Sequence, residues 1–176
     1  MQKTVHATVV LLRDGAGRVC LAPKKLNIHK QGKELEGSRK KLNGYGGKQE
    51  PDESILQTAI RELEQESSVR GNEADLELAA QISFFWPGNE TTEPDMLVHF
   101  FFLSRYEGEP KEGSEMGEPC FYLPEEIPYK DMMVADVFFF PKILNGERIV
   151  CDIHHMKLAG GGDTYSFDIK NSLPAL

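Results

Sequence analysis

The chain has 176 residues, of which 40% are hydrophobic and 27% charged, and its formal net charge is -8 at pH 7. The length suits one globular domain spanning residues 1–176, and the acidic charge argues against a general nucleic-acid-binding protein, whose binding surface is usually basic. No apolar run approaches the roughly 20 residues of a membrane-spanning helix, and the N-terminal sequence has no signal-peptide core, so we expect a cytoplasmic protein without a membrane partner.

The cysteines give no sign of a disulfide framework. Cys20, Cys120 and Cys151 are widely spaced among apolar neighbours, so we expect reduced core residues. His154 and His155 are adjacent, and neighbouring residues of a strand usually point to opposite faces, so this pair does not predict a zinc site.

Two strands and a basic segment come first in the chain. Residues 5–12 form a β-branched apolar run that predicts a buried strand, and a glycine turn joins it to a second strand at 18–23. Lysine and arginine are then concentrated in residues 24–48 of this acidic chain. Such a concentration could gather an anionic substrate, but for Lys30 to Lys40, within the insert at 27–41, we favour a solvated loop.

A glycine-rich turn at residues 43–48 leads into the helix around which the chain is organised. Gly44, Gly46 and Gly47 permit positive φ angles and a close approach of the backbone, so that a carbonyl or amide group can reach a phosphate or a metal ion. Lys48 adds a positive charge beside them. The turn therefore predicts a segment that contacts a phosphate chain or a metal ion.

The helix that follows is amphipathic and acidic. Pro51 and Asp52 predict its start, and from Glu53 onward apolar residues recur every three or four positions. On another side Glu62 and Glu66 lie one turn apart, where two stacked carboxylates repel each other unless a cation lies between them. Because Mg²⁺ prefers oxygen ligands, the pair predicts a magnesium site, with a solvated acidic helix face as the alternative.

The rest of the chain predicts more strands and a second helix. We expect a helix at 131–144, a loop at 107–119, and strands at 76–85, 96–103, 120–123, 149–158 and 164–169. The run Phe84-Phe85-Trp86 is typical of sheet core, with the wall of a base-binding pocket as the alternative. Strands around two main helices predict an α/β layered domain with a mixed sheet.

One motif within this order resembles a known family. It consists of Gly47, five residues, Glu53, seven residues, and then Arg61-Glu62-Leu63-x-x-Glu66. This spacing resembles the signature of the Nudix family, Mg²⁺-dependent hydrolases that cleave nucleoside diphosphates linked to another moiety. The resemblance implies a Nudix-like α/β/α sandwich with a mixed β-sheet. Within the motif, the opposite charges of Glu53 and Arg61 suit a structural ion pair that orients the helix and the loop.

Two positions depart from the family pattern. Gln65 stands where the family has the first glutamate of a pair, which removes one possible metal ligand. Ser68 stands where it has glycine, which removes an easy left-handed end for the helix.

Further segments match one branch of that family: residues 43–48, Ser114-Glu115-Met116 followed by Pro119-Cys120-Phe121, residues 127–132, and Asp163-Thr164. Through them most of the chain resembles the oxidised-purine nucleoside triphosphatases, or MutT-like 8-oxo-dGTP diphosphatases. The resemblance implies that the carbonyl of Gly46 and the carboxylates of Glu62, Glu66 and Glu115 bind the metal ion. The same three glutamates would carry catalysis, with either Glu66 or Glu115 as the base.

The branch reads its purine with an asparagine before the glycines and with two aspartates after a tryptophan and a proline. Asn43 and Asp136 match, whereas Met133, Val134 and Ala135 replace the tryptophan, the proline and the first aspartate. An amide and a carboxylate can still bond a base edge, and a methionine can cover a ring face. The expected substrate contacts are Lys24, Asn43, Tyr45, Gly46, Gly47, Lys48, Met133 and Asp136.

These observations together predict a Mg²⁺-dependent nucleoside triphosphate pyrophosphohydrolase, with Mn²⁺ as a second usable ion. The resemblance implies purine nucleotides, oxidised ones included, as its substrates and a nucleoside monophosphate and pyrophosphate as its products. Other family substrates are alternatives: ADP-ribose, a dinucleoside polyphosphate, or capped RNA bound at the basic insert. A weakly catalytic nucleotide sensor is a further alternative, motivated by Gln65 and Ala135. The oligomeric state stays open at this level.

Overall fold

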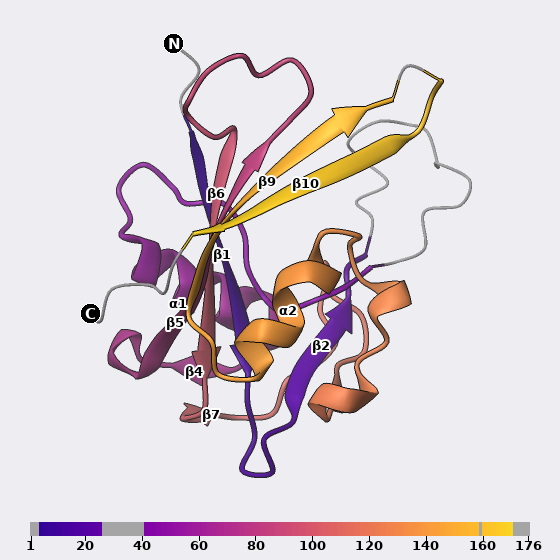
Figure 1. The fold of residues 1–176 in the computed structure, drawn as a ribbon. Coiled ribbons are helices and arrows are strands. Elements are labelled where there is room, and N and C mark those ends of the chain that lie inside the picture. Colours follow the sequence, from indigo (N-terminus) through magenta and orange to yellow (C-terminus); the bar gives the residue numbers. More distant parts are fainter. Residues whose placement is uncertain (1–3, 26–40, 159, 171–176) are drawn as a thin grey trace.

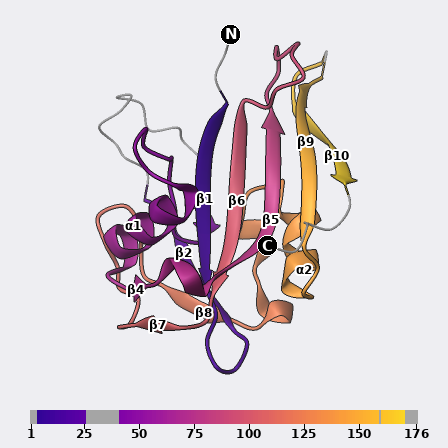
Figure 2. The ribbon, with the colours of Figure 1, turned by 90° about the vertical axis from the view of Figure 1, so that its left-hand side faces the viewer.

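The computed structural model describes residues 4–25, 41–158 and 160–170. Within them, five strands form one sheet in the order β1-β6-β5-β9-β10 (Figure 2). The pairs β1–β6 and β5–β9 are parallel, and the pairs β5–β6 and β9–β10 are antiparallel, so the sheet is mixed, as predicted. The strands are β1 (Val5–Leu12), β5 (Leu76–Phe85), β6 (Met96–Leu103), β9 (Ile149–Lys157) and β10 (Asp163–Lys170).

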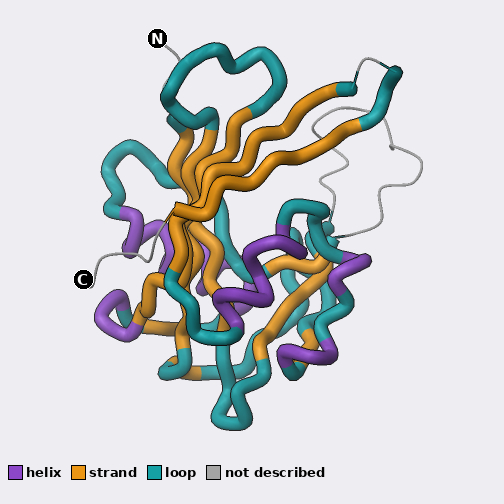
Figure 3. The backbone as a smooth tube through the Cα atoms, in the orientation of Figure 1, coloured by secondary structure: helices purple, strands orange, loops and turns teal. Residues whose placement is uncertain are grey.

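Two helices, α1 (Ile55–Ser67) and α2 (Asp136–Leu144), cover opposite faces of this sheet (Figures 1 and 3). Side chains that alternate along β1 divide the core: Val9 and Leu11 belong to the cluster beneath α2, and Val10 and Leu12 to the cluster beneath α1. Burial of both apolar clusters fixes α1, and with it the acidic motif, against the sheet. The sandwich predicted from the sequence is confirmed. Among the described helices, none is both long and apolar enough to cross a membrane.

Short strands build a second layer beside β1. In it β2 (Val19–Pro23) pairs antiparallel with both β3 (Leu42–Asn43) and β8 (Cys120–Tyr122). The end of β2 therefore lies close to segments that are about 20 and 100 positions further along the chain. A separate two-stranded pair joins β4 (Arg70–Gly71) to β7 (Tyr106–Glu107).

Two expectations for these segments change. Cys20 and Cys151 are buried free thiols as expected, but Cys120 is free and exposed, because β8 is an edge strand of the small layer. Nearly all of the basic insert at 27–41, for which a solvated loop was expected, lies outside the described residues.

The helix α1 begins later than Pro51 and Asp52, so that prediction is wrong. Ser54 is the N-cap: its Oγ accepts the N–H of Gln57 at 3.1 Å, and Oε1 of Gln57 accepts the N–H of Ser54 at 2.8 Å. This reciprocal pair satisfies two N–H groups that the first turn of a helix leaves free. As a result Glu53 lies outside the helix, where its side chain can fold back over it.

The helix predicted at 131–144 also begins later. Tyr129–Asp131 forms a single 3-10 turn, and α2 begins at Asp136. The carboxylate of Asp136 accepts the N–H of Met133 at 3.2 Å, which gives the preceding backbone a partner other than a helical carbonyl. Met133 thereby stays outside the helix.

Candidate active site

The glycine-rich turn lies against β1. The N–H of Thr8 donates to the carbonyl of Gly47 at 2.9 Å. A Cβ at Gly46 would lie 2.0 Å from the carbonyl oxygen of Thr8, and one at Gly47 would lie 2.5 Å from the carboxyl carbon of Glu62. The glycines are needed for this close approach. The positive φ angles expected from the sequence are not found in this turn.

Glu66 places its carboxylate against the same turn. The residue is 6% exposed, and its Oε2 accepts the N–H of Gly46 at 2.7 Å. The Nζ of Lys24 lies 3.8 Å from Oε1. Burial raises the pKa of Glu66, the bond from Gly46 and the charge of Lys24 oppose that rise, and the charges of Glu62 and Glu115 add to it. The structure therefore brings the three predicted carboxylates into one region.

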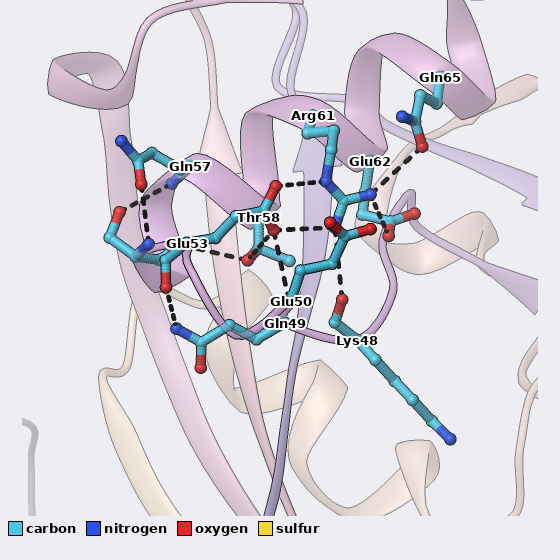
Figure 4. Close-up of polar contacts among 10 residues, drawn as sticks. Lys48, Gln49, Glu50, Glu53, Gln57, Thr58, Arg61, Glu62 and Gln65 are labelled. Atoms are coloured by element: carbon cyan, nitrogen blue, oxygen red, sulfur yellow. Dashed lines mark hydrogen bonds and ion pairs between the residues drawn. The ribbon is translucent and has the colours of Figure 1, made fainter.

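Arg61 links the segment before α1 to the helix (Figure 4). Its Nε and Nη2 donate to Oε1 and Oε2 of Glu53 at 2.6 and 3.0 Å, so the expected ion pair is present in a bidentate form. Oγ1 of Thr58, on the first turns of α1, donates to Oε2 of Glu53 at 2.9 Å. The hydrogen bonds from Arg61 are the main reason that the pKa of Glu53 falls to about 2. Glu53 is therefore ionised at any ordinary pH.

The third nitrogen of Arg61 contacts the acidic side of α1. Nη1 donates to Oε1 of Glu62 at 2.7 Å and to Oε1 of Gln65 at 3.2 Å. One guanidinium thus fixes Glu62 in front of the glycine turn. Gln65, the departure from the family pattern, is exposed and is a neutral partner of Arg61. The side chain of Lys48 extends away from this network (Figure 4).

The loop that carries Glu115 lies between β2 and the end of α1. The N–H of Gly117 donates to the carbonyl of Pro23 at 2.8 Å, and the N–H of Lys111 donates to the carbonyl of Ser67 at 3.0 Å. These contacts bring Glu115 close to the C-terminal end of α1, although it lies far along the chain. The sequence alone, without the family resemblance, gave no reason to place it there.

Two of the residues expected to read a base, Met133 and Asp136, lie at the start of α2. Asp136 is 8% exposed, and burial raises the pKa of its carboxyl to about 7 while the charge of Lys41 lowers it. Nζ of Lys41 also donates to the carbonyl of Lys130 at 3.4 Å. The side chain of Lys41, two residues before Asn43, thus contacts the segment that leads to Asp136. Met133 is 53% exposed beside them, free to cover a flat ligand.

Tyr45 does not belong to this site, so its expected substrate contact is corrected. Its side chain is fully buried in the core beneath α1, and its hydroxyl lies 3.5 Å from Sγ of Cys20. Tyr45 follows Gly44 along a segment paired with β1, and this pairing turns its ring inward.

Two contributors to the site were not predicted from the sequence. Thr58 is fully buried and bonded to Glu53, and its spacing of four from Glu62 was the available signal. Lys25 contacts the Glu115 loop through its Nζ, which donates to the carbonyl of Gly113 at 2.7 Å. No local pattern marks a contact between residues 88 positions apart.

The NUDIX domain model matches residues 3–141, which include the glycine turn, α1 and the Glu115 loop. The chain belongs to the Nudix family. Among the relatives of this Nudix protein, an oxidized purine nucleoside triphosphate hydrolase of Danio rerio is 38% identical over 110 residues, covering 62% of this chain and 67% of that protein. One of the same name from Mus musculus is 34% identical over 107 residues, covering 60% of this chain and 64% of that protein.

Solved structures share the fold of this Nudix chain. The crystal structure of a mutator MutT protein from Bacillus halodurans matches it with a TM-score of 0.69 and 21% sequence identity, covering 94% of this chain and 97% of that one. The Nudix arrangement of a mixed sheet and two helices is thereby confirmed. The chain spans about two thirds of the two curated relatives named above.

Nudix hydrolases generally need divalent metal ions, and the residues of this chain fit that requirement. Glu62, Glu66 and Glu115 supply oxygen donors, which hard divalent cations prefer. The charges of its two neighbours raise the pKa of the buried Glu66, and a cation would relieve that repulsion. Among the described residues, no three Asp, Glu, His or Cys side chains already surround a point that an ion could occupy. Binding would therefore draw these carboxylates closer together.

Proposed function

We propose that this Nudix chain is a Mg²⁺-dependent nucleoside triphosphate pyrophosphohydrolase that acts on purine nucleotides, oxidised ones included, and cleans the nucleotide pool. Mn²⁺ would serve in place of Mg²⁺. The observation that carries this proposal is the buried carboxylate of Glu66, bonded to Gly46 and surrounded by the charges of Glu62, Glu115 and Lys24. The names of the zebrafish and mouse relatives support the choice of substrate.

The residues divide into three groups by role. Glu62, Glu66, Glu115 and the carbonyl of Gly46 would hold the metal ion, which when bound lowers the pKa of a water and offsets the charge of the phosphates. Lys24 and Lys48 would contact the phosphate chain, since an ammonium group stabilises the charge that develops on it. The remaining group reads the base, and consists of Asn43, Met133 and Asp136.

The reaction adds one water across the bond between the α- and β-phosphates. The water oxygen bonds to phosphorus, the bridging oxygen leaves with the other fragment, and the products are a nucleoside monophosphate and pyrophosphate. Glu66 or Glu115 accepts the proton of the water. Arg61 and Glu53 take no part in this transfer; they hold Glu62 in place.

The test is a rate comparison with Mg²⁺ over dGTP, 8-oxo-dGTP, 2-hydroxy-dATP, ADP-ribose and capped RNA, with identification of the products. We expect purine triphosphates to be converted to monophosphate and pyrophosphate fastest. Turnover of ADP-ribose or capped RNA without turnover of any triphosphate would overturn the choice of substrate.

A nucleotide sensor is a second candidate, favoured by the position of Gln65. Its amide oxygen bonds to Arg61, so the residue adds no carboxylate to the metal site. A sensor would bind nucleotides in calorimetry and would show no Mg²⁺-stimulated hydrolysis. Hydrolysis that requires Glu66 would exclude it.

We also propose that the protein works in the cytoplasm on small nucleotides. The free thiols of Cys20, Cys120 and Cys151 support this location, because reduced cysteines are typical of that compartment. Fractionation of cells that express the full chain would test it, and recovery in a secreted or membrane fraction would contradict it.

A further inference from the structure

Two consecutive lysines at the end of β2 make different contacts. The Nζ of Lys24 lies 3.8 Å from Oε1 of Glu66, at the carboxylate cluster formed by Glu62, Glu66 and Glu115. Lys25 has its Nζ 2.7 Å from Oε1 of Glu112 and donates to the carbonyl of Gly113 at 2.7 Å. Neighbouring side chains of extended backbone point to opposite sides, which explains the division. Only Lys24 faces the cluster directly.

The backbone of Lys25 holds the same loop. Its N–H donates to the carbonyl of Glu115 at 2.6 Å, so one residue contacts the loop through both its main chain and its side chain. A turn closes between these two contacts, because the N–H of Gly113 donates to the carbonyl of Met116 at 2.9 Å. Met116 is fully buried and anchors the end of the turn in the core beneath α1. The position of Glu115 is therefore set from the side of β2.

Little space remains on the side of α1. A Cβ at Gly113 would lie 3.0 Å from the carbonyl oxygen of Glu66, so the turn already lies against the helix. The ammonium of Lys25 also forms an ion pair with Glu112, at the start of the turn. Without the side chain of Lys25 the turn would lose one hydrogen bond and one ion pair that hold it on the side of β2.

We propose that Lys25 is a positioning residue that holds the Glu115 turn, residues 112–116, beside Glu62 and Glu66, so that Glu115 can join them when a metal ion binds. It acts through Glu115 and does not touch the substrate. The inference rests on the proposed function, since it gives Glu115 a role at the metal. Removal of a group that orients a metal ligand commonly weakens metal binding by about 10- to 100-fold.

The test compares Lys25→Met with Lys25→Arg, which keeps the charge and donors, and with Lys111→Met, which removes an exposed lysine of the same loop. Amide hydrogen exchange of residues 112–117 is measured in the metal-free protein. The affinity for Mn²⁺ is measured by paramagnetic resonance, and the Mg²⁺ dependence of hydrolysis is measured with the full chain. We expect Lys25→Met to exchange faster in the turn and to bind Mn²⁺ about tenfold more weakly.

The same variant should need about tenfold more Mg²⁺ for half-maximal rate, and its KM for the nucleotide should change little at saturating Mg²⁺. Lys25→Arg should restore most of both properties, and Lys111→Met should match the unmodified chain. Unchanged Mn²⁺ affinity and Mg²⁺ requirement in Lys25→Met would overturn the proposal, whether or not the turn exchanges faster. If the unmodified chain shows no Mg²⁺-stimulated hydrolysis, the proposed function fails instead, and the exchange and Mn²⁺ measurements still decide the role of Lys25.

Discussion

Asp136 makes the stability of the protein depend on pH in an unusual direction. Burial raises the pKa of its carboxyl from 3.8 to about 7, so the folded state disfavours the ionised form. The protonated carboxyl costs the folded state nothing, so its contribution to the free energy of unfolding is fully present below pH 3.8. This contribution is lost as the pH rises through about 7. A shift of this size corresponds to about 4 kcal/mol at most, all of it lost in weakly alkaline solution.

Asp136→Asn removes the ionisation and keeps an oxygen that can accept the N–H of Met133. The free energy of unfolding in urea, measured between about pH 5 and pH 8.5, should fall with pH in the unmodified chain and fall less steeply in the variant. Above pH 8 the variant should be more stable by about 2–4 kcal/mol. Glu90→Gln, which removes an exposed carboxylate, is the matched control. Parallel curves for the chain and for Asp136→Asn would refute the reasoning.

Three further predictions follow from the site. Gly47→Ala should lower hydrolysis at least about tenfold with little change in Tm, because its Cβ would displace the carboxylate at the end of the Glu62 side chain. A Cβ at Gly15 would have no atom within 4 Å, so Gly15→Ala should change neither hydrolysis nor Tm. Equal activities of the two variants would contradict this. Ser68→Gly should raise Tm by about 2–4 °C, because Ser68 ends α1 with a φ of 63°, where a non-glycine residue is strained. A lower Tm in the variant would contradict this strain. Glu53 has a pKa of about 2, so its contribution to stability is present above about pH 4.5 and is lost as the pH falls toward 2. Glu53→Gln should therefore make Tm depend less on pH over that range. An unchanged dependence of Tm on pH would count against the ion pair.

Local patterns predicted the parts of the fold that depend on periodicity. The apolar spacing of α1, the β-branched run of β1 and the aromatic run of β6 decide which faces are buried, and these elements were predicted correctly from the sequence. The helix starts were not. The helix α1 begins after the capping box at Ser54 and not at Pro51, and the N–H of Met133 bonds to the side chain of Asp136 and not to a helical carbonyl. Helix propensity alone does not predict which of these alternatives forms.

The site was predictable to the extent that it lies on one helix. Glu62 and Glu66 share a face of α1 because they are four residues apart. The position of Glu115 depends on β2, and that of Lys25 on a contact with Gly113, so both follow from tertiary packing. The inward rotation of Tyr45 likewise follows from its pairing with β1, which a glycine-rich sequence does not reveal.

Glu66→Gln tests the central claim most directly. The amide keeps an oxygen to accept the N–H of Gly46, so the fold and Tm should be preserved while the negative charge is lost. Mg²⁺-stimulated conversion of purine triphosphates to monophosphate and pyrophosphate should fall by at least about 100-fold. A variant that hydrolyses these nucleotides at the rate of the unmodified chain, with the same Mg²⁺ requirement, would contradict the account.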